Sequence, residues 1–131
     1  MSSNQYLNPR TMSPPRGYTQ VVKSGNTVYI AGQVAAAQDG SVVGKGDAEA
    51  QARQIWRNIE AAVKAAGGTG VQNVVKTTTY VTNIQHAVGV RKVREELFKS
   101  FTPPTSTLLV VAGLASPDYM IEIEAIAVVG E

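Results

Sequence analysis

The chain of 131 residues contains no cysteine and one histidine, His86. Without cysteine there is no disulfide framework, no thiolate nucleophile and no thiolate metal site. His86 lies in the segment "NIQHAV", which contains no Asp or Glu. The sequence therefore predicts no metal site and no nucleophile triad in which histidine acts as the base.

Long apolar runs are also missing. No run approaches the roughly 20 residues that a membrane-spanning helix needs. The N-terminus lacks the basic region followed by an apolar stretch that marks a signal peptide. We therefore expect a cytoplasmic protein with no membrane partner.

Neither sign of charge dominates the chain, which contains twelve Lys and Arg residues and ten Asp and Glu residues. No basic cluster could neutralise several phosphates, so a nucleic-acid partner is not expected. A composition of 44% hydrophobic and 17% charged residues is typical of a folded globular chain. The length predicts a single domain over residues 1–131.

The first half of the chain predicts an arm, a hairpin and a helix. Residues 1–17 are rich in Ser, Pro and Asn and predict an irregular or partly ordered arm. Two β-type runs, 18–23 and 27–34, are separated by "SGN", in which Gly25 and Asn26 suit positive φ angles. A helix begins after Asp47, a predicted N-cap, and ends at Gly67.

The second half predicts a strand over 73–82, a second helix, and two closing strands over 106–112 and 119–129. Pro103 and Pro104 are expected to end the second helix. Its apolar face is predicted to hold Val90, Val93, Leu97 and Phe101. The order ββαβαββ predicts an α+β fold with one sheet and two helices on one face.

The closing strand, "YMIEIEAIAVV", alternates in an unusual way. If the row that begins at Ile121 faces the helices, Glu122 and Glu124 point to the other face and lead into Ile126 and Val128. Such a half-apolar face is rarely left bare on a monomer. We therefore expect an oligomer that encloses the carboxylates at a subunit boundary, where they serve either chemistry or assembly alone.

Four segments carry a resemblance to a known family: "VVKSGNTVYIAGQV", "QARQIWRNIEAAVKAAGG", "NVVKTTTYVTNI" and "IEIEAIAVV". They resemble the Rid proteins, the reactive intermediate deaminases of the YjgF type, also labelled endoribonuclease L-PSP. The resemblance runs from about residue 17 to residue 129. It implies a chorismate-mutase-like fold and a homotrimer with a central barrel and three intersubunit clefts. Members of this family hydrolyse 2-aminoacrylate-type enamines and imines without a metal or organic cofactor.

In deaminating members an arginine of a "P-A-R-S" segment holds the substrate carboxylate through a bidentate contact. The matching stretch here is "PPTSTLLVV", which places Ser106, or Thr105 after a one-residue slip, at the arginine position. The chain is thus similar to an arginine-lacking branch of the family. Tyr18 matches the aromatic residue that closes the cleft, and Glu122 matches the carboxylate that positions water.

The position where an asparagine often lies on the second helix corresponds to Arg91. Arg91 either brings a guanidinium into the cleft, as an anion clamp or a partner of Glu122, or belongs to a solvated charged run. Ser106 and Thr107 are expected to donate hydrogen bonds to the ligand. The resemblance implies a trimer that binds a small carboxylate or carbonyl metabolite, with enamine or imine hydrolysis left open. The alternatives are a non-catalytic binding or interaction trimer and, third, a ribonuclease.

Overall fold

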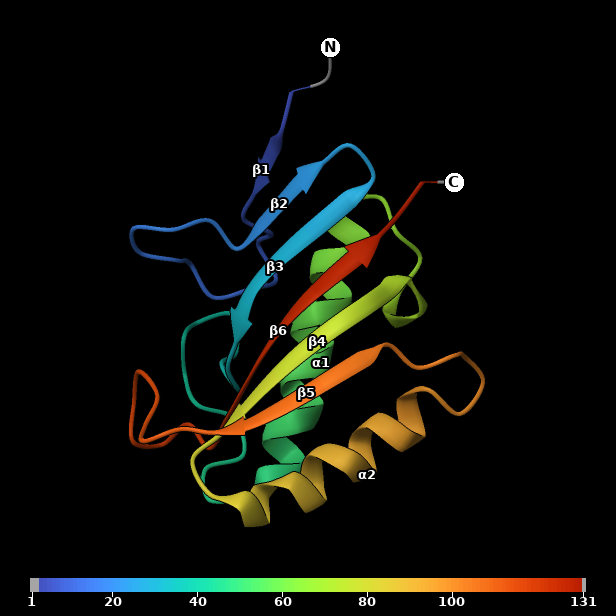
Figure 1. The fold of residues 1–131 in the computed structure, drawn as a ribbon. Helices are drawn as coiled ribbons and strands as arrows, with labels where there is room; N and C mark the ends of the chain where they lie inside the picture. The colour runs from blue at the N-terminus through green and yellow to red at the C-terminus, as the bar shows by residue number, and fades with distance from the viewer. Residues whose placement is uncertain (1–2, 131) are drawn as a thin grey trace.

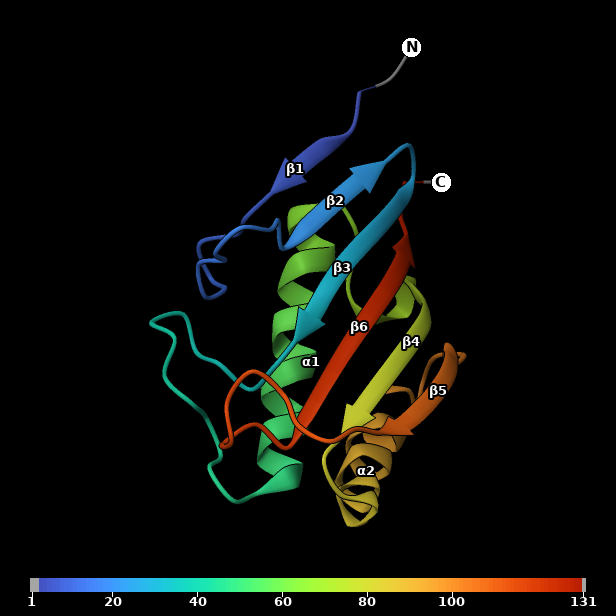
Figure 2. The same ribbon diagram turned by 60° about the vertical axis from the view of Figure 1, so that its left-hand side comes forward.

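The computed structural model describes residues 3–130, which form a six-stranded mixed sheet with both long helices on one face (Figures 1 and 2). The strand order is β1-β2-β3-β6-β4-β5, and only β4 and β5 run parallel. The predicted α+β fold is confirmed. The strands are β1 (Gln5–Leu7), β2 (Val21–Ser24), β3 (Thr27–Gln33), β4 (Val74–Val81), β5 (Thr105–Val110) and β6 (Ile121–Val128). The helices are α1 (Ala48–Ala65) and α2 (Ala87–Leu97), with short 3-10 turns η1 (Val71–Asn73) and η2 (Ile84–His86).

The residues at the two ends of helix α1 explain where the helix begins and where it ends. The Asp47 side chain accepts a hydrogen bond from the backbone N–H of Ala50 at 3.0 Å, which satisfies a donor in the first turn. At the other end Gly67 adopts a φ of 94°, a conformation that favours glycine. The Gly68 N–H then bonds the Val63 carbonyl at 2.9 Å. Both predicted helix signals are confirmed.

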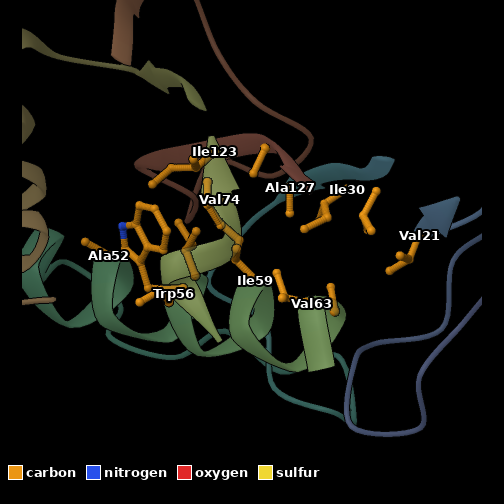
Figure 3. Close-up of a cluster of buried hydrophobic side chains, with 14 of the residues drawn as sticks. Val21, Ile30, Ala52, Trp56, Ile59, Val63, Val74, Ile123 and Ala127 are labelled. Carbon is orange, nitrogen blue, oxygen red and sulfur yellow. The ribbon is translucent and has the colours of Figure 1, made fainter. Parts of the chain in front are cut away.

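The hydrophobic core lies between α1 and the centre of the sheet (Figure 3). Ile123 and Ala127 of β6 point toward the helix, as the alternation of the closing strand predicted. Ile59 of α1 faces them and is fully buried. Burial of such a side chain contributes about 1.5–3 kcal/mol, so this layer fixes which face of β6 remains open.

The N-terminal arm differs from the expectation. Residues 5–7 form β1, which pairs antiparallel with β2 at the sheet edge, and Met12 is buried in the core. A strand of three residues is too short to show an apolar period, so the sequence pattern gives no sign of it. The order of the main elements is therefore βββαβαββ.

Helix α2 ends at Leu97, well before Pro103, so the predicted stop was wrong. The chain leaves the helix there and turns Phe98 into the core, where it meets Trp56 edge to face at 5.4 Å. Phe101, which the helical period placed on the apolar face, is 43% exposed. The helical spacing would place Phe101 on the apolar face, but α2 ends before it reaches Phe101.

In the hairpin turn Gly25 has a positive φ of 59°, whereas Asn26, also predicted to have one, does not. Among residues 3–130, no helix has the length and apolar character needed to cross a membrane.

Candidate active site on the open face of the sheet

Glu122 lies half-buried on the open face of β6, opposite Tyr80 of β4. A register shift in β3 between Ile30 and Gln33 places an extra residue beside β6, in the manner of a β-bulge. This irregularity brings Gly32 against the glutamate. A Cβ atom on Gly32 would lie 2.8 Å from Cδ of Glu122, so the glutamate has room only because this residue is glycine.

Burial raises the pKa of Glu122, and the nearby Glu124 carboxylate raises this pKa further. Glu122 takes part in none of the ion pairs or side-chain hydrogen bonds found within residues 3–130. A carboxyl group with a raised pKa and no fixed partner is a candidate for proton transfer.

Glu124 has a different environment, although it lies on the same face. The Tyr80 hydroxyl donates to its Oε1 at 2.6 Å, and this bond is the main reason that the pKa of Tyr80 is raised. Glu124 is therefore held by a neighbour within the chain. This contact fits the structural alternative for Glu124, whereas Glu122 keeps its carboxylate free.

A pocket of about 210 Å³ is lined in part by Gly32, although Glu122 itself is not among its lining residues. Tyr18, which is 55% exposed, and Gly32 both line it, so the structure places Tyr18 on the same pocket as the glycine that Glu122 contacts. Figure 2 shows that the loop after β3 and the loop before β6 come together at this end of the sheet. Three buried amide side chains also line it: Gln20, Gln33 and Asn58.

Ser106 and Thr107 point to opposite faces of β5. Ser106 pairs with Thr77, whose side chain is buried toward the helices, and Thr107 pairs with Thr78 on the open face. The two hydroxyls therefore do not converge on one ligand within a single chain. Their expected roles as donors stay predictions.

The guanidinium that reaches Ser106 belongs to Arg94, not to Arg91. Arg94 Nη1 donates to Ser106 Oγ at 2.9 Å. Arg91 is exposed on α2 and takes part in no ion pair within residues 3–130. Helix α2 covers the face of the sheet opposite to Glu122, so Arg91 and Glu122 of one chain lie on different sides of the sheet.

Sequence reasoning singled out Arg91 and missed this contact of Arg94. The helical period contained a signal, because Arg94 follows Val90 by four residues and precedes Leu97 by three, which puts it at the border of the apolar face. Within residues 3–130 no cluster of three or more His, Asp or Glu side chains could hold a metal ion.

Comparison with known proteins identifies the family. The family model for endoribonuclease L-PSP matches residues 9–129, almost the whole chain. The chain belongs to this family. The resemblance to Rid proteins of the YjgF type is thereby confirmed.

Two curated relatives match over nearly their full lengths. A RutC family protein of Pyrococcus horikoshii is 34% identical over 119 residues, which cover 91% of this chain and 90% of the relative. A 2-iminobutanoate/2-iminopropanoate deaminase of Dermatophagoides farinae is 31% identical over 125 residues, with 94% and 91% covered.

The fold also closely matches that of a solved structure. The crystal structure of YyfA from Yersinia pestis, a protein of the conserved Rid family, superposes with a TM-score of 0.90 at 30% identity. The superposition covers 97% of this chain and 100% of YyfA. Rid membership and the α+β sheet with its two helices are thus supported by sequence and by structure.

Proposed function

We propose that this Rid protein hydrolyses small 2-imino acids, or their enamine tautomers, to 2-keto acids and ammonia. The observation that carries the proposal is Glu122, a half-buried carboxyl group on the open face of the sheet with a raised pKa and, within residues 3–130, no ion-pair partner. The deaminase from Dermatophagoides farinae supports the same activity, because its name states this chemistry and it aligns over 94% of this chain.

Glu122 can serve the proton transfers that hydrolysis of the protonated imine needs. In its carboxylate form it accepts a proton as water adds to the iminium carbon, giving a carbinolamine. In its acid form it returns that proton to the nitrogen; the C–N bond then breaks while the carbinolamine hydroxyl gives its proton back to the carboxylate, so that ammonia leaves and the 2-keto acid remains. A pKa above the usual glutamate value favours this double role, because both forms are then populated closer to neutral pH.

The substrate carboxylate needs a cationic partner, and Arg94 is the candidate. In the deaminating members that this chain resembles, an arginine occupies the position that matches Ser106, or Thr105 after a one-residue slip. Here Arg94 reaches Ser106 from α2, at 2.9 Å. A planar guanidinium can bind a carboxylate through two parallel hydrogen bonds wherever its second edge is free.

The complete site is proposed to form between copies of the chain in a homotrimer. Several large apolar side chains on the sheet are exposed: Tyr29 at 50%, Leu109 at 47% and Val128 at 43%. Arg94 and Glu122 of one chain lie on different faces, so a shared cleft would combine them from neighbouring copies. Light scattering after size exclusion should give three times the chain mass, and Tyr29→Glu should lower both that mass and the activity.

The activity can be tested with an imine made in place. An L-amino-acid oxidase converts L-alanine to 2-iminopropanoate, which semicarbazide captures as an ultraviolet-absorbing semicarbazone. Added protein should lower the initial rate of semicarbazone formation, because hydrolysis competes with capture. Glu122→Gln should remove this effect, whereas Glu124→Gln should retain it. No effect of the wild-type protein at any concentration would contradict the proposal.

The second candidate is a non-catalytic trimer that binds a small carboxylate. The hydroxyl of Ser106 at the usual arginine position favours this alternative. It predicts binding of pyruvate in a calorimetric titration together with no acceleration in the imine assay. A ribonuclease would need a basic groove, and the near balance of twelve basic and ten acidic residues gives no support for one.

A further inference from the structure

We propose that a second cavity, on the helix side of the molecule, binds a free α-amino acid with an apolar side chain. The cavity has a volume of about 190 Å³, and its lining comes from α1, α2 and η1. Glu122 lies on the opposite face of the sheet and does not line it. The inference therefore goes beyond the proposed reaction and does not depend on it.

Four of the lining residues are apolar and come from all three elements. Trp56 of α1 is 3% exposed, Val93 of α2 is 1% exposed and Val71 of η1 is 6% exposed, while Leu97 of α2 is partly buried against them. The Nε1 atom of Trp56 is sealed from solvent without a partner within residues 3–130, so a ligand meets the indole ring rather than its N–H. Such a surface favours an apolar group, because contact removes apolar area from water.

The charged part of the lining belongs to α1, on the helix face that also carries Trp56. It consists of Arg53, Arg57 and Glu60. Arg53 is already engaged, since its Nη2 contacts Glu49 at 2.8 Å and its Nη1 contacts Glu96 at 2.7 Å. Arg53 therefore forms a wall of the cavity but leaves no free charge for a ligand.

Arg57 and Glu60 are a cation and an anion without a strong partner. Arg57 is exposed and takes part in no ion pair within residues 3–130, and its Nη1 reaches Gln54 Oε1 only at 3.4 Å. Glu60 lies 4.0 Å from Lys64 Nζ, and an exposed contact of this kind contributes little. Arg57 and Glu60 do not pair with each other, although residues three apart on a helix can do so. Both charges thus remain available at the cavity.

An α-amino acid matches this combination of groups. Its carboxylate can accept from the Arg57 guanidinium, its ammonium group can donate to the Glu60 carboxylate, and an apolar side chain can contact Trp56 and Leu97. A carboxylate without an amine would leave Glu60 unpaired, and an amine without a carboxylate would leave Arg57 unpaired. The volume lies below the range of about 300–1,000 Å³ that is typical of drug-sized ligands, which favours a ligand as small as one amino acid.

The tryptophan makes binding measurable at the site itself. Trp56 is the only tryptophan of the chain, so a proton–nitrogen correlation spectrum contains one indole resonance. L-Leucine should move this resonance in a saturable manner. 4-Methylpentanoate, which lacks the amine, and 3-methylbutylamine, which lacks the carboxylate, should each bind about fivefold more weakly, the upper end for one exposed ion pair. An indole resonance that leucine does not move, or equal affinities of the three compounds, would overturn the proposal.

Two variants assign the two ends of the ligand. Arg57→Gln should lower the affinity for leucine about fivefold without lowering that for 3-methylbutylamine, because the amine never used the guanidinium. Glu60→Gln should lower the affinity for leucine by a similar factor without lowering that for 4-methylpentanoate. A general loss of structure would weaken all three ligands in both variants, so these opposite patterns are specific to the proposed contacts. Variants that weaken all three ligands alike would overturn the assignment.

Matched controls remove one exposed charge each outside the lining. Lys99→Gln corresponds to Arg57→Gln, and Glu95→Gln corresponds to Glu60→Gln. Both controls should leave the affinity for leucine within about twofold, because solvent and salt screen charges that do not contact the ligand. Losses as large as those of the lining variants would refute the site.

Two further titrations separate the apolar contact and the proposed reaction from the charges. L-Serine carries the same charged groups without the apolar side chain and should bind at least about fivefold more weakly than leucine. Equal affinities for serine and leucine would contradict an apolar subsite. Glu122→Gln, which should abolish imine hydrolysis, should leave leucine binding unchanged, so the amino-acid site and the reaction can fail independently.

Discussion

Replacement of Arg94 by alanine tests whether this guanidinium holds the substrate carboxylate. Arg94 donates to Ser106 Oγ at 2.9 Å, which places its guanidinium next to the residue that the resemblance matches to the family's arginine. A hydrogen bond to a charged group contributes about 1.5–3 kcal/mol. Since about 1.4 kcal/mol is a factor of ten, Arg94→Ala should weaken pyruvate binding and lower kcat/KM by about 10- to 150-fold.

The matched control is Arg91→Ala, three residues earlier on the same helix. Arg91 is exposed and without an ion pair in the described chain, so its loss should leave both quantities within about twofold. Calorimetry with pyruvate and the semicarbazide assay measure the two effects. The double variant Arg94→Ala with Ser106→Arg should recover binding, because the guanidinium returns from the strand itself. Equal effects of Arg91→Ala and Arg94→Ala would refute the assignment.

Three further changes test the site and the core. Glu124→Gln should move the acidic limb of the kcat/KM profile to lower pH, because loss of the neighbouring charge lowers the pKa of Glu122, whose carboxylate form accepts the proton. Gly32→Ala should lower kcat about 100-fold in the semicarbazide assay, because its Cβ would lie 2.8 Å from Cδ of Glu122 and displace the carboxylate. Phe98→Ala should lower the free energy of unfolding by about 3–5 kcal/mol in urea titrations, whereas the exposed Phe101→Ala should cost less than about 1 kcal/mol.

Each of these three predictions has an experimental outcome that would contradict it. An acidic limb that stays in place, or moves to higher pH, would show that Glu124 does not act on the catalytic carboxyl group. Gly113→Ala is the control for Gly32, because a Cβ at Gly113 meets no atom within 4 Å. Equal activity losses in the two glycine variants would remove the steric argument. Similar destabilisation by the two phenylalanine variants would contradict the burial of Phe98.

The sequence predicted the parts of the fold that are determined by residues close together along the chain. Asp47 and Gly67 mark the ends of α1 through their own side chain and backbone chemistry, and the alternation from Ile121 onward identifies the buried face of β6. β1 and the turn at Phe98 depend instead on distant partners. β1 is held by pairing with β2, and Phe98 is held by packing against the ring of Trp56. No local sequence pattern predicts either contact.

For the site, the pattern was enough to place Glu122 on the open face but not to decide which arginine lies near Ser106. A helical period separates faces by about 100° per residue, so it distinguishes Arg91 from Arg94 only when the register of α2 against β5 is known. The raised pKa of Glu122 could not be predicted either, because it arises mainly from the burial of the side chain in the folded protein.

The irregularity in β3 affects both faces of the sheet. One extra residue between Ile30 and Gln33 sets Gly32 against the Glu122 carboxylate and also turns Gln33 toward α1, where its amide meets Gln20. A regular strand would exchange the faces of the residues that follow, moving the amide out of the pocket and a side chain onto the glutamate. The same local departure from the ladder therefore gives the Glu122 carboxyl group its space on the open face and places the Gln33 amide on the helix side, so both features depend on one irregularity of the backbone.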